Sequence, residues 1–124
     1  MQKYKKVMVF GVFDGLHEGH LYFLNEAKKL CDALIVVVAS DIDVGMYKKK
    51  SPKYLLKERI KALKLTGIPN TVVEGDNEPD SWWVIKKYAP DIVAVGHDQE
   101  AIAESLKKCC SNIKIARIDF IPTP

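Results

Sequence analysis

The sequence lacks several features that would place the chain in a specialised class of protein. It has three cysteines in 124 residues, one isolated and two adjacent, so it contains neither a CxxC pair nor an even disulfide framework. No apolar run approaches the roughly eighteen residues that span a bilayer, and no signal-peptide core follows the lysine-rich start. Internal repeats and low-complexity tracts are also missing. These absences predict a cytoplasmic protein without a membrane segment.

The charge of the chain is small and gives little support to nucleic-acid binding. Nineteen basic and 16 acidic residues leave a net charge of +3, and the lysines are scattered in pairs and one triplet. Arginine-rich or aromatic-interleaved basic tracts, which mark nucleic-acid interfaces, do not occur. With 48% hydrophobic residues in 124, the chain is long enough for one domain with a core and too short for two ordinary domains.

Apolar strand-like runs alternate with amphipathic helical patterns along the whole chain, which is typical of a parallel sheet wrapped by helices. The expected strands cover about residues 6–13, 33–39, 70–74, 91–95 and 113–120. We therefore predict an α/β, Rossmann-like, doubly wound fold. It has a five-stranded parallel sheet of order 3-2-1-4-5 with helices on both faces.

The expected helices have start and stop signals in the sequence. The first covers about residues 18–30, and the second is predicted to begin with Ser51 as its N-cap, Pro52 as its first residue and Leu65 on its apolar face. Ser81 is predicted to cap the third helix, which carries Trp82 and Trp83, and the fourth helix runs to Lys108 or Cys110. Neighbouring side chains on a helix point about 100° apart, so at most one of the two tryptophans faces the core squarely.

The stretch from Gly11 to His20 carries the strongest functional signal. It joins an apolar run, Val7 to Phe10, to the first helical pattern, and it places His17 and His20 at the start of that helix. A helix N-terminus presents unpaired backbone N–H groups and the positive end of the macrodipole, so it favours anions. Two imidazoles add further donors. The alternatives are half of a metal site, or histidines that only cap the helix and lie on the surface.

This stretch resembles the GxFDxxHxGH signature of the cytidylyltransferase-like nucleotidyltransferases, a family that includes glycerol-3-phosphate cytidylyltransferase and archaeal-type FAD synthetases. The matching positions are Gly11, Phe13, Asp14, His17, Gly19 and His20. The resemblance implies magnesium-dependent transfer of a nucleoside monophosphate from a nucleoside triphosphate to a phosphorylated acceptor. It gives His17 and His20 the role of binding the phosphates and stabilising charge on the α-phosphorus, and it lets Asp14 orient the acceptor or the metal.

The resemblance also assigns residues around this signature. Val12 belongs with the signature glycines and Phe13 in nucleotide binding, and no direct side-chain ligand of a metal is assigned. One lysine among Lys48, Lys49 and Lys50 is expected to reach the triphosphate; for any single one, the alternative is a solvated basic loop. Arg59 lies where cytidylyltransferases place an arginine near the nucleotide, and the alternative is a surface ion pair.

The segment Gly96-His97-Asp98-Gln99 follows the predicted fourth strand and is the second candidate for nucleotide binding. In a sheet of order 3-2-1-4-5 the direction of winding reverses between strands one and four, where ligands bind at the carboxyl ends. Asp98 alternatively only caps the next helix. The segment looks more like the GxDQ turn of archaeal-type FAD synthetases than like the turn of glycerol-3-phosphate cytidylyltransferase, which favours ATP as donor and FMN as acceptor.

Other functions remain open at this point. They are a CTP-dependent cytidylyltransferase acting on glycerol 3-phosphate or another phospho-alcohol, a non-catalytic nucleotide-binding domain, and an electron-transfer flavodoxin-like protein, which would leave HxGH unexplained. Members of the resembled family usually continue with a Ser/Thr segment and a last helix after the point where this sequence reaches Pro124. We therefore expect either a truncated sequence or a variant that has lost part of the phosphate site. The apolar surplus of the tryptophan-bearing helix predicts a homodimer.

Overall fold

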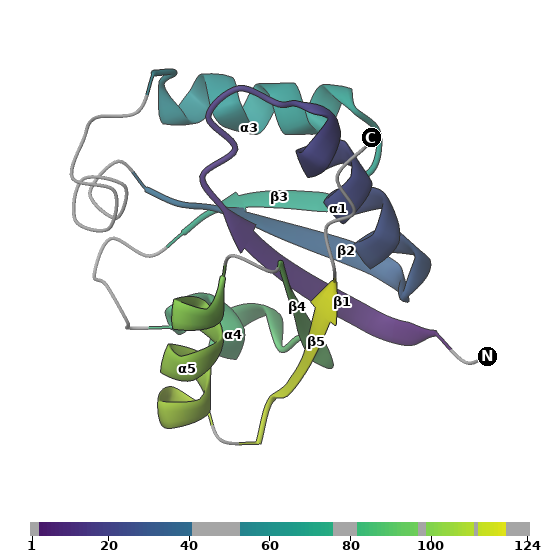
Figure 1. Cartoon of the computed structure of the whole chain (residues 1–124), viewed down its shortest axis with the longest axis vertical. Helices are drawn as coiled ribbons and strands as arrows, with labels where there is room; N and C mark the ends of the chain where they lie inside the picture. Colours follow the sequence, from purple (N-terminus) through teal and green to yellow (C-terminus); the bar gives the residue numbers. More distant parts are fainter. Residues whose placement is uncertain (1–2, 41–52, 76–81, 97–98, 111, 119–124) are drawn as a thin grey trace.

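Five parallel strands form the centre of the structure, and helices cover both faces of the sheet (Figure 1). The computed structural model describes residues 3–40, 53–75, 82–96, 99–110 and 112–118. The strands are β1 (Tyr4–Gly11), β2 (Cys31–Val38), β3 (Thr71–Glu74), β4 (Ile92–Gly96) and β5 (Lys114–Ile118). Their order is β3-β2-β1-β4-β5 with every neighbouring pair parallel, which confirms the predicted topology.

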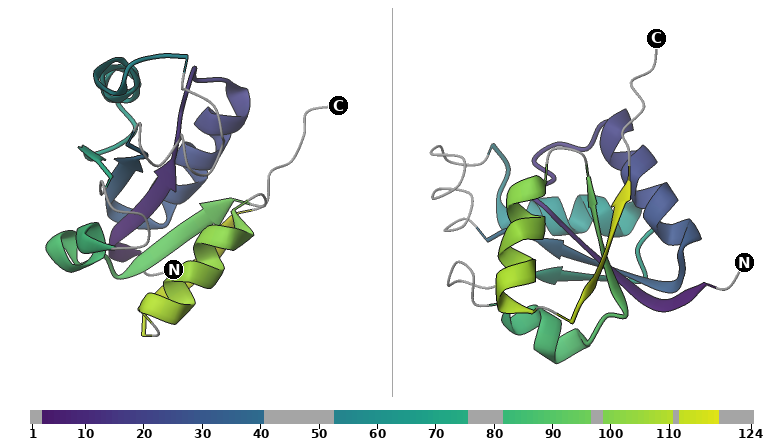
Figure 2. Two further views of the ribbon diagram at one scale, coloured as in Figure 1. Left: turned by 90° about the vertical axis from the view of Figure 1, so that its left-hand side faces the viewer. Right: turned by 60° about the horizontal axis from the view of Figure 1, so that its bottom comes forward.

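The helices divide into two layers, one on each face of the sheet (Figure 2). They are α1 (Glu18–Lys29), α3 (Leu56–Leu65), α4 (Trp83–Tyr88) and α5 (Glu100–Cys109). The inner strands are apolar on both faces, and successive residues alternate between the layers. Val7 packs with α1 and α3, whereas its neighbour Met8 packs with α4 and α5. Within the described residues, no helix is long and apolar enough to cross a membrane.

Helix α3 begins four residues later than the sequence predicts. Leu55 occupies its N-cap, so the prediction that Pro52 is the first helical residue is wrong; Ser51 and Pro52 themselves lie outside the described residues. The backbone N–H groups of Lys53 and Tyr54 donate to the distant Asp14 carboxylate at 2.6 and 2.8 Å, which holds this segment outside the helix. The Glu58 carboxylate then accepts the N–H of Leu55 at 3.2 Å. A tertiary contact therefore decides where the helix starts.

Two further details differ from the sequence prediction. Leu65, expected on the apolar face of α3, is 78% exposed, because Leu63 is the residue near this end that enters the core. The N-cap of α4 is Trp82 in a left-handed conformation (φ 54°), not Ser81, which lies outside the described residues. The indole Nε1 of Trp82 donates to Ser105 Oγ in α5 at 3.2 Å, whereas Trp83 is 60% exposed. The expectation that only one tryptophan faces the core is confirmed.

Candidate functional site

The signature turn, residues 11–17, connects β1 to α1. It leaves the sheet at Gly11 because Phe13 takes a left-handed conformation (φ 52°), so β1 ends two residues earlier than expected. The Phe13 ring folds back over Gly11. A Cβ atom at position 11 would lie 2.6 Å from Phe13 Cε2, so a side chain there would clash with a buried ring. The same ring contacts the imidazole of His20 edge to face, with 5.3 Å between ring centroids. Phe13 thus joins the end of β1 to the first turn of α1.

His17 and His20 form a stacked pair at the N-terminus of α1. His17 is the N-cap residue, and its Nδ1 accepts the backbone N–H of Gly19 at 3.0 Å. The backbone N–H of His17 in turn donates to Nδ1 of His20 at 3.4 Å, which completes a reciprocal capping box. The two rings lie 3.8 Å apart, centroid to centroid, with 24° between their planes. The sequence therefore places both imidazoles together, as the HxGH spacing predicts.

This capping arrangement fixes which nitrogen of each ring carries a proton. Because Nδ1 is the acceptor in both histidines, the proton of each neutral imidazole is on Nε2. The rings share their position with the positive end of the helix macrodipole. A pair of Nε2–H donors at such a site is suited to the oxygens of a phosphate, so capping and anion binding are compatible roles for the same two rings.

Asp14 uses both carboxylate oxygens on backbone groups. Oδ2 accepts the N–H of Lys53 and Oδ1 accepts the N–H of Tyr54, at 2.6 and 2.8 Å. The hydrogen bond from Lys53 is the main cause that holds the pKa of the Asp14 carboxyl below its usual value, and burial opposes it. In this structure Asp14 links the signature turn to the segment before α3. Each oxygen of an ionised carboxylate has a second lone pair beyond the one used here, so the role of Asp14 toward a metal ion or an acceptor stays a prediction.

Asp14→Asn tests this link through the pH dependence of stability. The folded-state pKa of Asp14 is lowered, so its carboxylate stabilises the fold above the unfolded pKa of about 3.9, and this contribution is lost as the pH falls through the folded pKa. We expect wild type to have a higher urea midpoint than Asp14→Asn at pH 7 and the difference to shrink by pH 3. A midpoint difference that is the same at both pH values would show that the charge of Asp14 does not contribute.

Arg59 is buried, with 1% of its surface exposed, so the alternative of a surface ion pair is wrong. Its Nη1 donates to the carbonyl oxygens of Val12 and Ala39 at 3.0 and 2.9 Å, and its Nε donates to that of Tyr54 at 3.2 Å. These carbonyls belong to the signature turn, to the residue after β2 and to the segment before α3. The guanidinium therefore holds these three segments together.

The second predicted segment is described at Gly96 and Gln99. The Gln99 side chain bridges β4 and β1: its Oε1 accepts the N–H of Gly96 at 2.9 Å and its Nε2 donates to the carbonyl of Phe10 at 2.7 Å. Gln99 is also the N-cap residue of α5. Capping of this helix is the alternative role that the sequence predicts for Asp98. The predicted residues His97, Asp98, Lys48, Lys49 and Lys50 lie outside the described residues.

The topology brings the two predicted segments to one edge of the sheet. β1 and β4 are parallel neighbours, so the turn after Gly11 and the turn after Gly96 both follow carboxyl ends of adjacent strands. Their described pairs are Val7 with Ile92, Met8 with Val93 and Val9 with Ala94, and each strand continues for two more residues beyond the last pair. This is the place where the sheet reverses its direction of winding and where open α/β sheets bind ligands.

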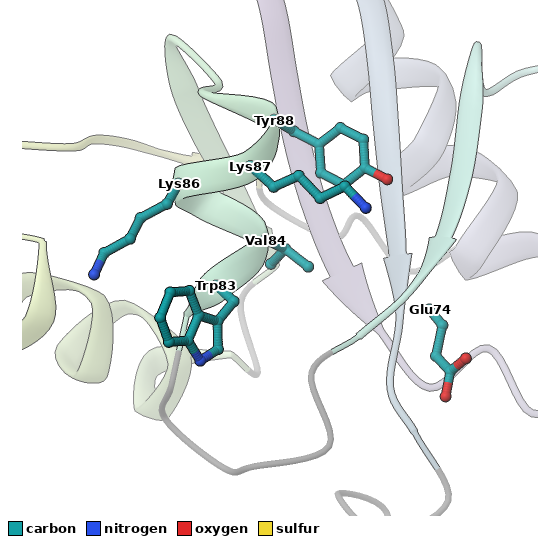
Figure 3. A pocket seen from close by; sticks show the side chains of 6 residues that line it. All are labelled: Glu74, Trp83, Val84, Lys86, Lys87 and Tyr88. Carbon is teal, nitrogen blue, oxygen red and sulfur yellow. The ribbon is translucent and has the colours of Figure 1, made fainter.

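A cavity of about 400 Å³ lies elsewhere, beside α4 and the end of β3 (Figure 3). Its described lining is Glu74, Trp83, Val84, Lys86, Lys87 and Tyr88, and none of these is a predicted site residue. The Lys86 ammonium lies 5.0 Å from the centroid of the Trp83 ring. Because α4 and α1 cover opposite faces of the sheet, this cavity is separate from the histidine pair.

Magnesium is the metal ion that the sequence resemblance implies for this site. Mg²⁺ prefers oxygen ligands in octahedral geometry. Among the described residues no group of three or more His, Cys, Asp or Glu side chains gathers closely enough to hold a metal ion. Asp14, the one carboxylate of the signature, has both oxygens on backbone N–H groups.

Several known proteins are similar to this chain in sequence. A sequence profile of the family described as Cytidylyltransferase-like matches residues 8–123. An FAD synthase from Thermococcus sibiricus is 40% identical over 126 residues, with 97% of this chain and 85% of that protein covered. An FAD synthase from Pyrococcus horikoshii is 37% identical, with 94% and 81% covered.

Solved structures extend the comparison to the fold. A lipopolysaccharide core biosynthesis protein from Thermoplasma volcanium superposes with a TM-score of 0.84 at 33% identity, covering 96% of this chain and 99% of that one. A pantoate–β-alanine ligase from Francisella tularensis, at 15% identity and a TM-score of 0.66, covers 98% of this chain and 61% of that one. The second likeness concerns the fold alone.

Proposed function

Because this chain belongs to the cytidylyltransferase-like family of nucleotidyltransferases, we propose that it is an FAD synthase, which transfers AMP from ATP to FMN and releases pyrophosphate. The observation that carries the proposal is its similarity to proteins named FAD synthase over nearly its whole length. The stacked histidines at the N-terminus of α1 support it, since they form a site suited to phosphate at the edge where such sheets bind ligands.

The chemistry is a displacement at phosphorus. An oxygen of the FMN phosphate forms a bond to the α-phosphorus of ATP, and the bond from that phosphorus to the bridging oxygen breaks, so that pyrophosphate leaves with the electron pair. Both reactants are anions, and the protein's task is to position them and stabilise the charge that develops between them. His17 and His20 supply donors for this charge, and the first turn of α1 adds its backbone N–H groups and dipole.

Several finer points belong to the same proposal. Magnesium accompanies the triphosphate and shields its charge, and Lys48, Lys49 or Lys50 contributes positive charge near it. Val12, Gly19 and Gly96 belong to the backbone around the nucleotide, with Arg59 and Gln99 holding that backbone in place. We further place the enzyme in the cytoplasm and expect it to work as a homodimer.

The test is a substrate matrix. ATP and CTP with magnesium are each combined with FMN and with glycerol 3-phosphate. Pyrophosphate release is measured together with the product of each pair, which is a flavin dinucleotide for FMN and a nucleoside diphosphate-glycerol for glycerol 3-phosphate. We expect turnover with ATP and FMN. Turnover with CTP and glycerol 3-phosphate would replace the adenylyltransferase by a cytidylyltransferase, and nucleotide binding without any pyrophosphate release would indicate a non-catalytic nucleotide-binding domain.

The homodimer can be tested at Trp83. Trp82 is packed against α5, so the apolar surplus that predicts association is concentrated in Trp83, whose ring is mostly exposed on α4. We expect light scattering to show a dimer for wild type and a monomer for Trp83→Glu at the same micromolar concentration. Leu65→Glu, on the opposite face of the sheet, is the matched control. Dissociation by Leu65→Glu alone would place the interface on α3, and a monomeric wild type would contradict the dimer.

A further inference from the structure

Tyr54 precedes Leu55, the N-cap residue of α3, and its ring rests against the signature turn. Gly15 in that turn has φ +93°, and a Cβ atom built on it would lie 3.5 Å from Tyr54 Cε2. The turn thus leaves room for the edge of the ring at a position where the backbone itself favours glycine. Tyr54 is nevertheless 44% exposed, so part of an aromatic side chain remains open to solvent beside the turn that leads to His17.

The backbone of Tyr54 is fixed from both sides. Its N–H donates to Asp14 Oδ1 at 2.8 Å, and its carbonyl oxygen accepts from Nε of the buried Arg59 at 3.2 Å. Asp14 is itself part of the signature turn. Arg59 is bonded to that turn, since its Nη1 donates to the carbonyl of Val12. An exposed ring on a backbone held in this way loses little freedom when it binds a ligand.

The position of Tyr54 within the sheet order indicates which substrate it meets. Arg59 ties the Tyr54 segment to Ala39, the residue that follows β2, so Tyr54 lies on the β2 side of β1. The Gly96 and Gln99 segment lies on the other side of β1, at the end of β4. If the nucleotide occupies the edge between β1 and β4, the second substrate approaches the histidine pair from the β2 side.

From this placement we infer that Tyr54 is the residue that stacks on the isoalloxazine ring of FMN and so directs the FMN phosphate toward His17 and His20. The inference rests on the proposed function. The isoalloxazine ring is flat, aromatic and large, and its preferred partner is the face or edge of another aromatic ring. Sequence reasoning missed this residue, because its contacts with Asp14 and Gly15 join positions about forty residues apart and leave no local pattern.

The first test separates the two substrates by their Michaelis constants. In Tyr54→Leu, which keeps an apolar side chain and removes the ring, we expect KM for FMN to rise about tenfold, equivalent to about 1.4 kcal/mol. KM for ATP should stay within about twofold of wild type. Leu65→Ala, a truncation of another exposed apolar side chain at the far end of α3, is the control and should change neither constant.

The second test uses the fluorescence of FMN bound to the protein without ATP. A tyrosine stacked on a flavin quenches its emission by donating an electron, whereas phenylalanine is not an electron donor of this kind. Tyr54→Phe keeps the ring, so we expect KM for FMN within about twofold of wild type together with a clear recovery of the bound flavin's fluorescence. A purely structural role for Tyr54 would not produce this combination.

Each outcome decides the inference or the function separately. Quenching that Tyr54→Phe relieves, without any FAD formation by wild type, would support the FMN contact and contradict adenylyl transfer. FAD formation by wild type with an unchanged KM for FMN in Tyr54→Leu would support the function and overturn the contact. A rise in KM for ATP alone in Tyr54→Leu would assign Tyr54 to the nucleotide and would overturn the FMN contact. Failure of wild type to bind FMN would overturn the contact as well.

Discussion

His20→Ala is expected to slow FAD formation at saturating ATP and FMN by about 10² or more. This is the typical loss when one donor to the developing charge of a transition state is removed. The surroundings of His20 fix its ring for that role. Its Nδ1 accepts the backbone N–H of His17, and its ring contacts the rings of both His17 and Phe13. The rate is measured as pyrophosphate release under conditions where wild type is saturated.

The fold is expected to survive this substitution, because His20 is only partly buried at the start of α1. Urea unfolding of the same preparation checks that point. Asn25→Ala, an exposed position further along α1, is the matched control and should keep the wild-type rate. Near-normal turnover of His20→Ala with both substrates saturating would remove His20 from the stabilisation of the transition state.

Among the substitutions considered, Arg59→Met is expected to lower the free energy of unfolding most, by about 3 kcal/mol or more. Methionine fills much of the same space but donates no hydrogen bonds, so the carbonyls of Val12, Ala39 and Tyr54 would lose the donor they share. Each buried polar group left without a partner costs about 1–3 kcal/mol. In a domain of this size we expect the melting temperature to fall by about 10 °C or more.

Arg117→Met provides the comparison for Arg59→Met. Arg117 pairs with Glu100 at 2.8 Å on the surface, and exposed pairs of this kind contribute about 0–1 kcal/mol. Thermal and urea unfolding of the two variants should therefore differ clearly. Equal, small losses in both would mean that water or neighbouring groups replace the guanidinium of Arg59 without cost, and that Arg59 does not hold the three segments together.

The strand order and the position of the histidine pair could be predicted because both depend on local patterns. The apolar run from Ala33 to Ala39 is continuous, as expected of a central strand, and the HxGH spacing places two imidazoles within one turn of helix. Both signals survive in the folded chain, since nothing distant overrides them.

The start of α3 and the surroundings of Asp14 could not be predicted, because they depend on contacts between distant segments. Ser51 and Pro52 form a good local start signal. The Asp14 carboxylate, however, accepts the backbone N–H groups of Lys53 and Tyr54, which follow directly. Helix propensity is a weak preference that tertiary contacts readily override. The exposure of Leu65 has a similar origin, since the rotation of α3 on the sheet is set by Leu63 and the buried Arg59.

The bridging side chain of Gln99 has a mechanical consequence for the sheet. Beyond Val9 and Ala94 the described edge between β1 and β4 is joined by one amide group, with its nitrogen on Phe10 and its oxygen on Gly96, in place of a continuing ladder. Separating β1 from β4 at this end therefore breaks the hydrogen bond from the Gln99 amide to the Phe10 carbonyl, while the pairs from Val7 to Val9 stay intact. The ligand-binding edge between β1 and β4 is thus held by a side chain, whereas the pairs further back along the two strands are held by backbone groups, so a substitution at Gln99 changes this edge without changing those pairs.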